Sequence, residues 1–116
     1  MAARKKEITE FGEFLVQMIS EAKMFKSDFY DAVGINKPYF YEILTSNAPP
    51  QETLEKMMSV LEDKLGYDEK RRHTFYNLAA KSRQEIPADI NDLIKSHPEE
   101  WGEIRTALLR KFAAQG

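Results

Sequence analysis

Hydrophobic and polar positions follow one another along most of this chain with the spacing of amphipathic helices. Between residues 8 and 23 apolar side chains recur every three or four positions, which places them on one helical face. This face comprises Ile8, Phe11, Leu15, Met18, Ile19 and Ala22. The same spacing predicts a helix over about Gln51–Leu65, and a further helix that Asp68 caps and that extends to Ala80. On the second of these, the residues expected to face solvent are Lys70, Arg71 and Arg72.

Two shorter helices are predicted between these long ones. Residues 27–33 form the first, Gly34 supplies the positive φ of a sharp turn, and Asn36 caps a second helix over residues 37–44. Pro38 falls in the first turn, where a missing N–H costs nothing. The side chains expected to pack between the two helices are Phe29, Val33, Ile35, Phe40, Ile43 and Leu44. Those expected to face outward are Lys37, Pro38, Tyr41 and Glu42.

The last third of the chain predicts two more helices after a charged connector over residues 81–85. Ile86 and Pro87 open a short helix, which ends at the His97-Pro98 pair because a residue before proline disfavours helical geometry. A final helix over about residues 99–112 carries an apolar stripe formed by Trp101, Ile104, Leu108 and Phe112. The chain thus predicts seven helices and no strand, which is an all-α fold.

Composition adds bounds on size and location. The chain has 116 residues, of which 42% are hydrophobic, and this suffices for one compact domain. It has no cysteine and no apolar run near the roughly 20 residues of a membrane span, so we expect a cytoplasmic protein with no membrane partner. Residues 1–7 predict a flexible basic arm. Its cations Arg4, Lys5 and Lys6 either follow a DNA backbone or minor groove, or only solvate the start of the chain.

The sequence offers little for catalysis. His73 and His97 lie outside any metal-ligand spacing, no glycine-rich phosphate loop occurs, and paired carboxylates fall on polar helix faces. We therefore expect no enzyme activity, no metal and no cofactor. The formal net charge of −2 lacks the positive excess that nucleic-acid-binding domains usually carry.

Two segments resemble a known family. AVGINKPYFYEIL (residues 32–44) and APPQETLEKMMSVL (residues 48–61) are similar to the Cro/cI-type, or XRE-like, helix-turn-helix regulators. The shared features are the glycine turn, the capped recognition helix, the polar loop, and the Pro-x-x-x-Thr-Leu start of the next helix at Pro49 to Leu54. The resemblance implies a five-helix, phage-repressor-like DNA-binding domain over residues 8–80. Residues 81–116 would be a two-helix C-terminal extension that serves as a candidate dimerisation element.

The resemblance also implies site residues. Recognition helix 37–44 would enter the major groove, with Lys37 donating to guanine, Tyr41 contacting a phosphate or a thymine methyl, and Glu42 accepting from cytosine N4 or remaining solvated. Asn36 would act mainly as the cap. The full set of expected DNA contacts is Lys26, Asn36, Lys37, Pro38, Tyr41, Glu42, Thr45, Ser46 and Asn47.

The resulting hypothesis is a sequence-specific transcriptional regulator, a repressor that binds an inverted-repeat operator in double-stranded DNA as a homodimer. Trp101, Leu108 and Phe112 either form the dimer interface or close the core of the monomer. The alternative is a protein-binding adaptor or antitoxin on the same scaffold, with the aromatic face of residues 39–41 binding a protein partner. Tyr30 replaces a small residue of the family, so it either widens the helix packing or directs its hydroxyl to the surface.

Overall fold

The computed structural model describes residues 7–113, and its regular elements are all helical. It contains seven α-helices and one short 3-10 helix within this range, which confirms the all-α prediction. The chain divides into two compact units, one ending at Ile86 and one beginning at Pro87. The predicted arm cations Arg4, Lys5 and Lys6 lie outside the described residues.

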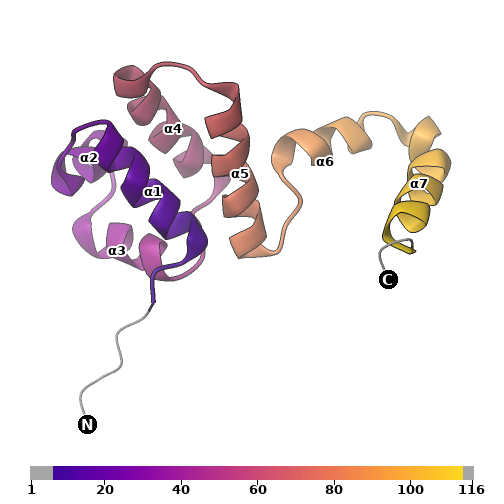
Figure 1. Ribbon diagram of the computed structural model, residues 1–116, viewed down its shortest axis with the longest axis horizontal. Coiled ribbons are helices and arrows are strands. Elements are labelled where there is room, and N and C mark those ends of the chain that lie inside the picture. The colour runs from indigo at the N-terminus through magenta and orange to yellow at the C-terminus, as the bar shows by residue number, and fades with distance from the viewer. Residues whose placement is uncertain (1–6, 114–116) are drawn as a thin grey trace, which may run out of the picture. The chain divides into compact units, whose positions relative to one another are not determined.

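The first unit holds five helices, shown in Figure 1: α1 (Glu10–Glu21), α2 (Lys26–Val33), α3 (Lys37–Thr45), α4 (Gln51–Leu65) and α5 (Glu69–Arg83). The second unit holds α6 (Ala88–Lys95), the 3-10 helix η1 (Pro98–Glu100) and α7 (Trp101–Ala113).

The helix ends follow from local chemistry. The side chains of Thr9, Asn36 and Asp68 accept hydrogen bonds from backbone N–H groups of the helices they precede, at 2.9, 2.9 and 2.8 Å. Gly34 and Gly66 have φ angles of 91° and 81°, a conformation that other residues rarely adopt. These caps and turns confirm the predicted helix starts at Asn36 and Asp68 and the predicted stops at both glycines.

Three local expectations are wrong. Ile8 precedes α1 and is 40% exposed, because the capping of Thr9 starts the helix only at Glu10. Helix α5 continues to Arg83, so most of the expected connector is helical, and Gln84 ends it in a left-handed conformation. Arg72 is expected to face solvent, but its guanidinium is bound to α4. It donates two hydrogen bonds to the Glu62 carboxylate, at 2.7 and 2.9 Å.

The core of the first unit is entirely apolar. Within the described residues no polar or charged side chain is buried. Helix α1 packs against α5 and α3, and α2 packs against α4, as the ribbon in Figure 1 shows. The core residues are Phe11, Leu15, Met18, Ile19, Phe29, Val33, Phe40, Ile43, Leu44, Ala48, Leu54, Met57, Met58, Leu61, Phe75 and Ala79. Five of the six residues expected between α2 and α3 belong to it, and Ile35 packs partly buried at its edge.

Tyr30 is accommodated by packing on α3. Its ring lies 5.4 Å from the ring of Phe40, centroid to centroid, and the side chain is half-buried at the edge of the core. Phe40 in turn contacts Phe29 edge to face at 6.1 Å. An aromatic cluster therefore fills the space between α2 and α3.

Candidate nucleic-acid interface

The turn between α2 and α3 fixes the direction in which α3 leaves the core. The backbone N–H groups of Gly34 and Ile35 both donate to the carbonyl of Tyr30, each at 3.0 Å, and so close the end of α2. Asn36 then caps α3 two residues later. The end of α2 and the start of α3 therefore both have local hydrogen-bond partners, and these fix the reversal of the chain.

Helix α3 has one buried face and one exposed face. Phe40, Ile43 and Leu44 are buried, while the positions between them face solvent. The exposed face consists of Lys37, Pro38, Tyr41 and Glu42, with Thr45 half-buried at its end. The spacing of one and three residues along this set is that of a single helical face. The structure therefore brings these five sequence-predicted residues together on one surface, which we name the α3 outer face.

Tyr41 is the most prominent apolar group of the α3 outer face. Its side chain is 42% exposed, and its ring stands edge-on to the ring of Phe40 at 5.3 Å between centroids. That contact restrains the ring without burying it. Thr45 uses its hydroxyl within the helix, donating to the carbonyl of Tyr41 at 3.1 Å. Because the hydroxyl hydrogen of Thr45 is already donated, its oxygen remains available to accept a hydrogen bond from a ligand.

The segment after α3 is tied to the rest of the first unit on both sides. The backbone N–H of Thr9 donates to the carbonyl of Leu44 at 3.0 Å, and the backbone N–H of Ala48 donates to the Ser82 hydroxyl at 3.0 Å. The Ser82 hydroxyl in turn donates a hydrogen bond to the carbonyl of Ala79, also at 3.0 Å. Ser46 and Asn47 lie between these anchors, so the loop that carries them is fixed at both ends.

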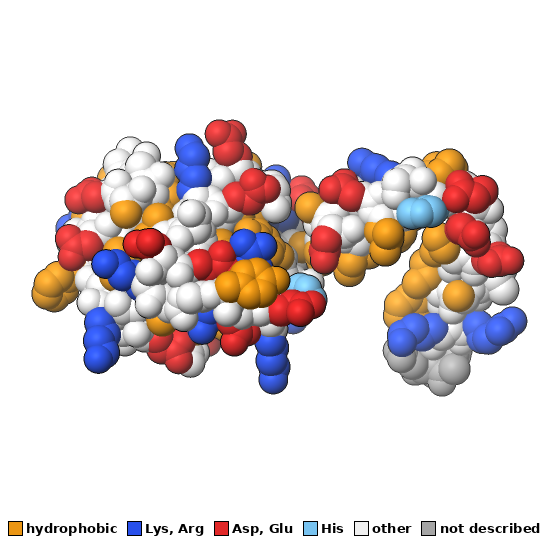
Figure 2. Space-filling model, turned by 90° about the horizontal axis from the view of Figure 1, so that it is seen from above, with side chains coloured by type: hydrophobic (Ala, Val, Ile, Leu, Met, Phe, Trp, Pro, Cys, Tyr) orange, Lys and Arg blue, Asp and Glu red, His pale blue; other side chains and the backbone are white. Residues whose placement is uncertain are grey.

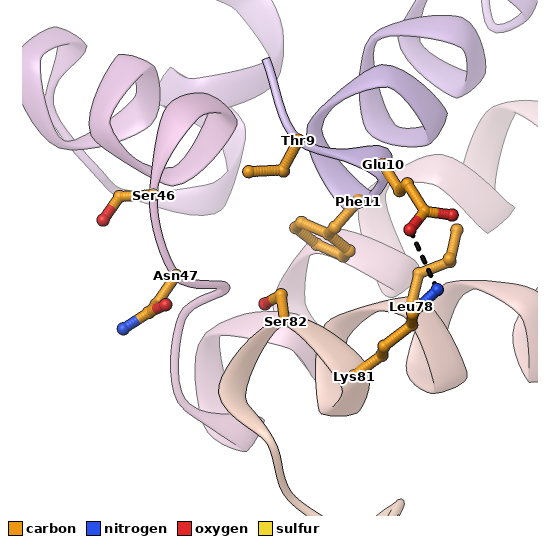
Figure 3. Close-up of a pocket in the computed structure, with 8 residues that line it drawn as sticks. All are labelled: Thr9, Glu10, Phe11, Ser46, Asn47, Leu78, Lys81 and Ser82. Carbon is orange, nitrogen blue, oxygen red and sulfur yellow. Dashed lines mark hydrogen bonds and ion pairs between the residues drawn. The ribbon is translucent and has the colours of Figure 1, made fainter. Parts of the chain in front are cut away.

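A shallow open pocket of about 350 Å³ lies beside this loop. Glu10 and Lys81 form an ion pair at 2.9 Å on one side of it, and Ser46 and Asn47 lie on the other. Figure 3 shows the side chains of Ser46 and Asn47 pointing away from that ion pair. Asn47 is exposed and Ser46 is half-buried, so both can be reached by a ligand beside the pocket.

Three lysines surround the α2–α3 segment. Lys23 follows α1, Lys26 begins α2 and Lys37 begins α3, and all three are exposed. None of them forms an ion pair with another described residue. By contrast, Lys81 and Arg72 are each bound to a carboxylate. The charges of these three lysines are therefore not neutralised by a described carboxylate and are available to an external anion.

Acidic residues in the same part of the sequence offset the positive charge of these three lysines. Residues 27–50 carry Asp28, Asp31 and Glu42 against the single cation Lys37, which sums to −2. Residues 51–68 carry five carboxylates against two lysines, which sums to −3. A phosphate backbone would therefore meet a mixed surface, with attraction concentrated at the three lysines.

The strongest electrostatic pair of the first unit lies on α4 and α5. The two hydrogen bonds from Arg72 hold the pKa of the Glu62 carboxyl below its usual value, and the same bonds raise the pKa of Arg72. The Arg72 guanidinium also lies 5.0 Å from the centroid of the Tyr67 ring. These contacts tie α4 to α5, so we assign them to stability.

The remaining sequence-predicted residues lie in the second unit. Trp101, Leu108 and Phe112 are on α7 and are 45%, 44% and 57% exposed. They do not close a core, since no residue of α6, η1 or α7 is buried.

The sequence does not reveal two contacts that α5 makes with distant segments. Ser82 accepts from the backbone N–H of Ala48 in the loop after α3, 34 positions away, and Lys81 donates to Glu10 of α1, 71 positions away. Sequence reasoning also missed Phe25, which is 78% exposed beside Lys26. The sequence alone does not distinguish an exposed phenylalanine at a helix start from a buried phenylalanine of the neighbouring apolar stripe.

Within residues 7–113 no three His, Asp or Glu side chains gather as metal ligands, and none of the helices in that range combines the length and apolar character needed to cross a membrane. Comparison with protein-family models, with curated proteins and with solved structures gives no match.

Proposed function

We propose that α2 and α3 form a helix-turn-helix and that the protein is a sequence-specific DNA-binding regulator, a repressor of the Cro/cI type. The observation that carries the proposal is the α3 outer face, a solvent-exposed helical surface whose opposite side is fixed in an apolar core. A helix held in this way can enter a major groove without rearranging.

In this function each exposed residue has a stated contact. Lys37, at the N-terminal end of α3, donates to the O6 and N7 acceptors of guanine, and Glu42 accepts from cytosine N4. Tyr41 lies against a thymine methyl or bonds a phosphate. Lys26, Ser46 and Asn47 contact the backbone and fix the register, while Asn36 keeps α3 capped.

The acidic balance limits what one copy can bind. Three available lysines against nearby carboxylates give few phosphate contacts, so the affinity of a single copy is low. Two copies on an inverted repeat double the contacts at once, which favours a homodimer as the binding species.

The test is a selection of genomic DNA fragments by the full chain, followed by titration of selected fragments at several salt concentrations. We expect log K to fall with log salt, and Lys37→Ala to reduce the preference for selected over random fragments by about 10-fold or more. Equal affinity of Lys37→Ala and wild type for selected fragments, or binding that ignores salt, would contradict the proposal.

Lys70→Ala is the matched control. Lys70 is exposed in the first turn of α5, and Ser82, which contacts the loop after α3, lies twelve residues further along the same helix. This separation is about 18 Å at the rise of an α-helix. The control therefore removes the same charge away from the α3 outer face and should leave fragment preference unchanged.

A second candidate is a protein-binding adaptor or antitoxin. Two exposed aromatic side chains, Phe25 and Tyr41, favour it, because such groups are enriched in protein interfaces. In that function Tyr41→Ala abolishes binding of a protein partner, and DNA binding with a salt dependence is absent.

A further inference from the structure

The second unit exposes a large share of its apolar side chains. Six of them are 44% to 65% exposed, and none of its described residues is buried. They are Ile90 and Leu93 on α6 and Trp101, Leu108, Leu109 and Phe112 on α7. Figure 2 shows hydrophobic side chains gathered on the sides of α6 and α7 that face the angle between the two helices. This arrangement is that of a corner whose inner surface is not covered by the described residues of its own unit.

Polar contacts shape the corner from within the unit. The Trp101 indole N–H donates to the carbonyl of Ile94 at 2.7 Å, and the Ser96 hydroxyl donates to the carbonyl of Leu93 at 3.0 Å. The Nδ1 atom of His97 lies 2.9 Å from that same carbonyl. These contacts join the end of α6 to the start of α7 and leave the apolar faces of both helices uncovered.

Charges change from acidic to basic over η1 and α7. Glu99 and Glu100 belong to η1 and Glu103 to the first turn of α7, Arg105 lies in the middle of α7, and Arg110 and Lys111 lie in its last turn. Glu100 and Lys111 are eleven residues apart, which is three helical turns, so they lie on the same flank of the apolar stripe. Both are exposed, and neither pairs with another described residue.

We propose that the apolar corner binds the same corner of a second copy of this chain, with the two α7 helices packed antiparallel about a two-fold axis. An antiparallel pair centred near Thr106 places Ile104 opposite the partner's Leu108 and Trp101 within one residue of the partner's Phe112. The same register places Glu100 within one residue of the partner's Lys111. Apolar stripe and charged flank are thus complementary to themselves, as an isologous interface requires.

The parallel arrangement lacks this complementarity. It would bring the acidic N-terminal ends of two α7 helices together, and it would also bring their basic last turns together. Like charges placed side by side destabilise a helix pair. It would also align the two helix dipoles, whereas antiparallel helices place the N-terminus of one beside the C-terminus of the other. Charge therefore selects the antiparallel pair.

The exposed apolar area of the corner is of the order that a dimer interface requires. Large aromatic side chains bury on the order of 150–250 Å² each, so six half-exposed apolar side chains offer roughly 500 Å² per copy. A standard interface buries about 800 Å² per partner, and its polar rim supplies the difference. The proposal requires no DNA, so it can fail or succeed independently of the proposed regulatory function.

The test measures the mass of the full chain by sedimentation over a concentration series, without DNA. Wild type is expected to be dimeric, and Leu108→Glu monomeric with an unchanged thermal unfolding midpoint of the first unit, whose core contains no residue of α7. A wild type that stays monomeric, or a Leu108→Glu variant that still forms dimers, would overturn the proposal.

Charge exchange tests the antiparallel register. Glu100→Lys and Lys111→Glu are each expected to weaken the dimer about 10-fold, because each converts two symmetry-related attractions into repulsions. The double variant Glu100→Lys, Lys111→Glu restores both attractions and should recover the wild-type constant to within about threefold. A double variant as weak as the two single variants would refute this register.

Glu103→Lys is the control for charge alone. Glu103 lies two residues after Trp101, on the opposite side of α7 from the apolar stripe. It carries the same charge change as Glu100→Lys and should leave the dimer constant within about threefold of wild type. A loss as large as that of Glu100→Lys would assign the effect to net charge, and the proposed pairing would be wrong.

Discussion

Asn36 illustrates how one residue serves both fold and surface. Its side-chain oxygen accepts from the Tyr39 N–H at 2.9 Å, which leaves the side-chain amide N–H groups as free donors at the N-terminal end of α3. The cap and the proposed DNA contact would use different atoms of the same side chain. Loss of the cap would therefore disturb the start of α3 as well as remove a donor.

The Glu62–Arg72 pair is the residue-scale contact with a defined pH dependence. We expect Arg72→Met to lower the free energy of unfolding by about 1 kcal/mol at neutral pH, since the Glu62 side chain is only 16% exposed and loses two hydrogen bonds. The folded-state pKa of Glu62 lies below the ordinary value of 4.5, so the pair stabilises the fold above that value. This contribution is lost as the pH falls through the lowered pKa.

Urea unfolding between pH 7 and pH 3 measures the effect. The difference between wild type and Arg72→Met should shrink at the acidic end, where Glu62 becomes protonated in both proteins. Lys70→Met, on the same helix and exposed, is the control and should match wild type throughout. A difference that stays constant with pH would show that packing of the Arg72 stem, and not the ion pair, stabilises the helix contact.

At the scale of elements, the parts of the fold that sequence predicts are those set by near neighbours. Asn36, Asp68 and the two left-handed glycines act on backbone groups a few residues away, so their effect is visible in the local sequence. The outer face of α3 follows for the same reason, since helical spacing alone separates Phe40 from Tyr41. This predicts the surface, but not its ligand.

The contacts that sequence does not predict join distant segments. The end of α5, the Arg72 pairing and the Ser82 contact to Ala48 depend on which helices meet in space. In the sequence Lys81 belongs to a charged connector, whereas in the structure its Nζ atom lies 2.9 Å from Oε1 of Glu10. Such residues are polar in either case, and only the packing of α1 on α5 decides their partners.

Gly12 is the clearest of these tertiary requirements at the contact between α1 and α3. A Cβ atom at this position would overlap the carbonyl oxygen of Leu44, a backbone atom at the end of α3 that also accepts from Thr9. We expect Gly12→Ala to lower the free energy of unfolding by about 1–3 kcal/mol, since α1 and α3 must move apart. Urea denaturation of the full chain measures the change.

Gly102→Ala is the matched control, because a Cβ atom there meets nothing within 4 Å. In the exposed helix α7 this substitution should be neutral or stabilise by about 0.5–1 kcal/mol through helix propensity. If Gly12→Ala proved as stable as wild type, the close approach of α1 to α3 would not be a requirement of the fold.

At the scale of the whole molecule, the two compact units have different roles in the proposed function. All residues of the apolar core lie between Phe11 and Ala79, so the first unit holds the core and the α3 outer face. The second unit holds the apolar corner proposed to bind another copy. The core of the first unit and the proposed DNA contact thus involve different residues from the proposed association.

A chain ended at Ile86 tests this division. We expect it to unfold at the same midpoint as the first unit of the full chain, because the removed residues contribute no buried side chain. Binding to a selected DNA fragment should weaken, and the slope of log K against log salt should fall to about half of its value for the full chain. That change corresponds to losing one of two equal sets of phosphate contacts. An unchanged slope would mean that one copy makes all the phosphate contacts, whereas a lowered unfolding midpoint would mean that α6 or α7 supports the core of the first unit.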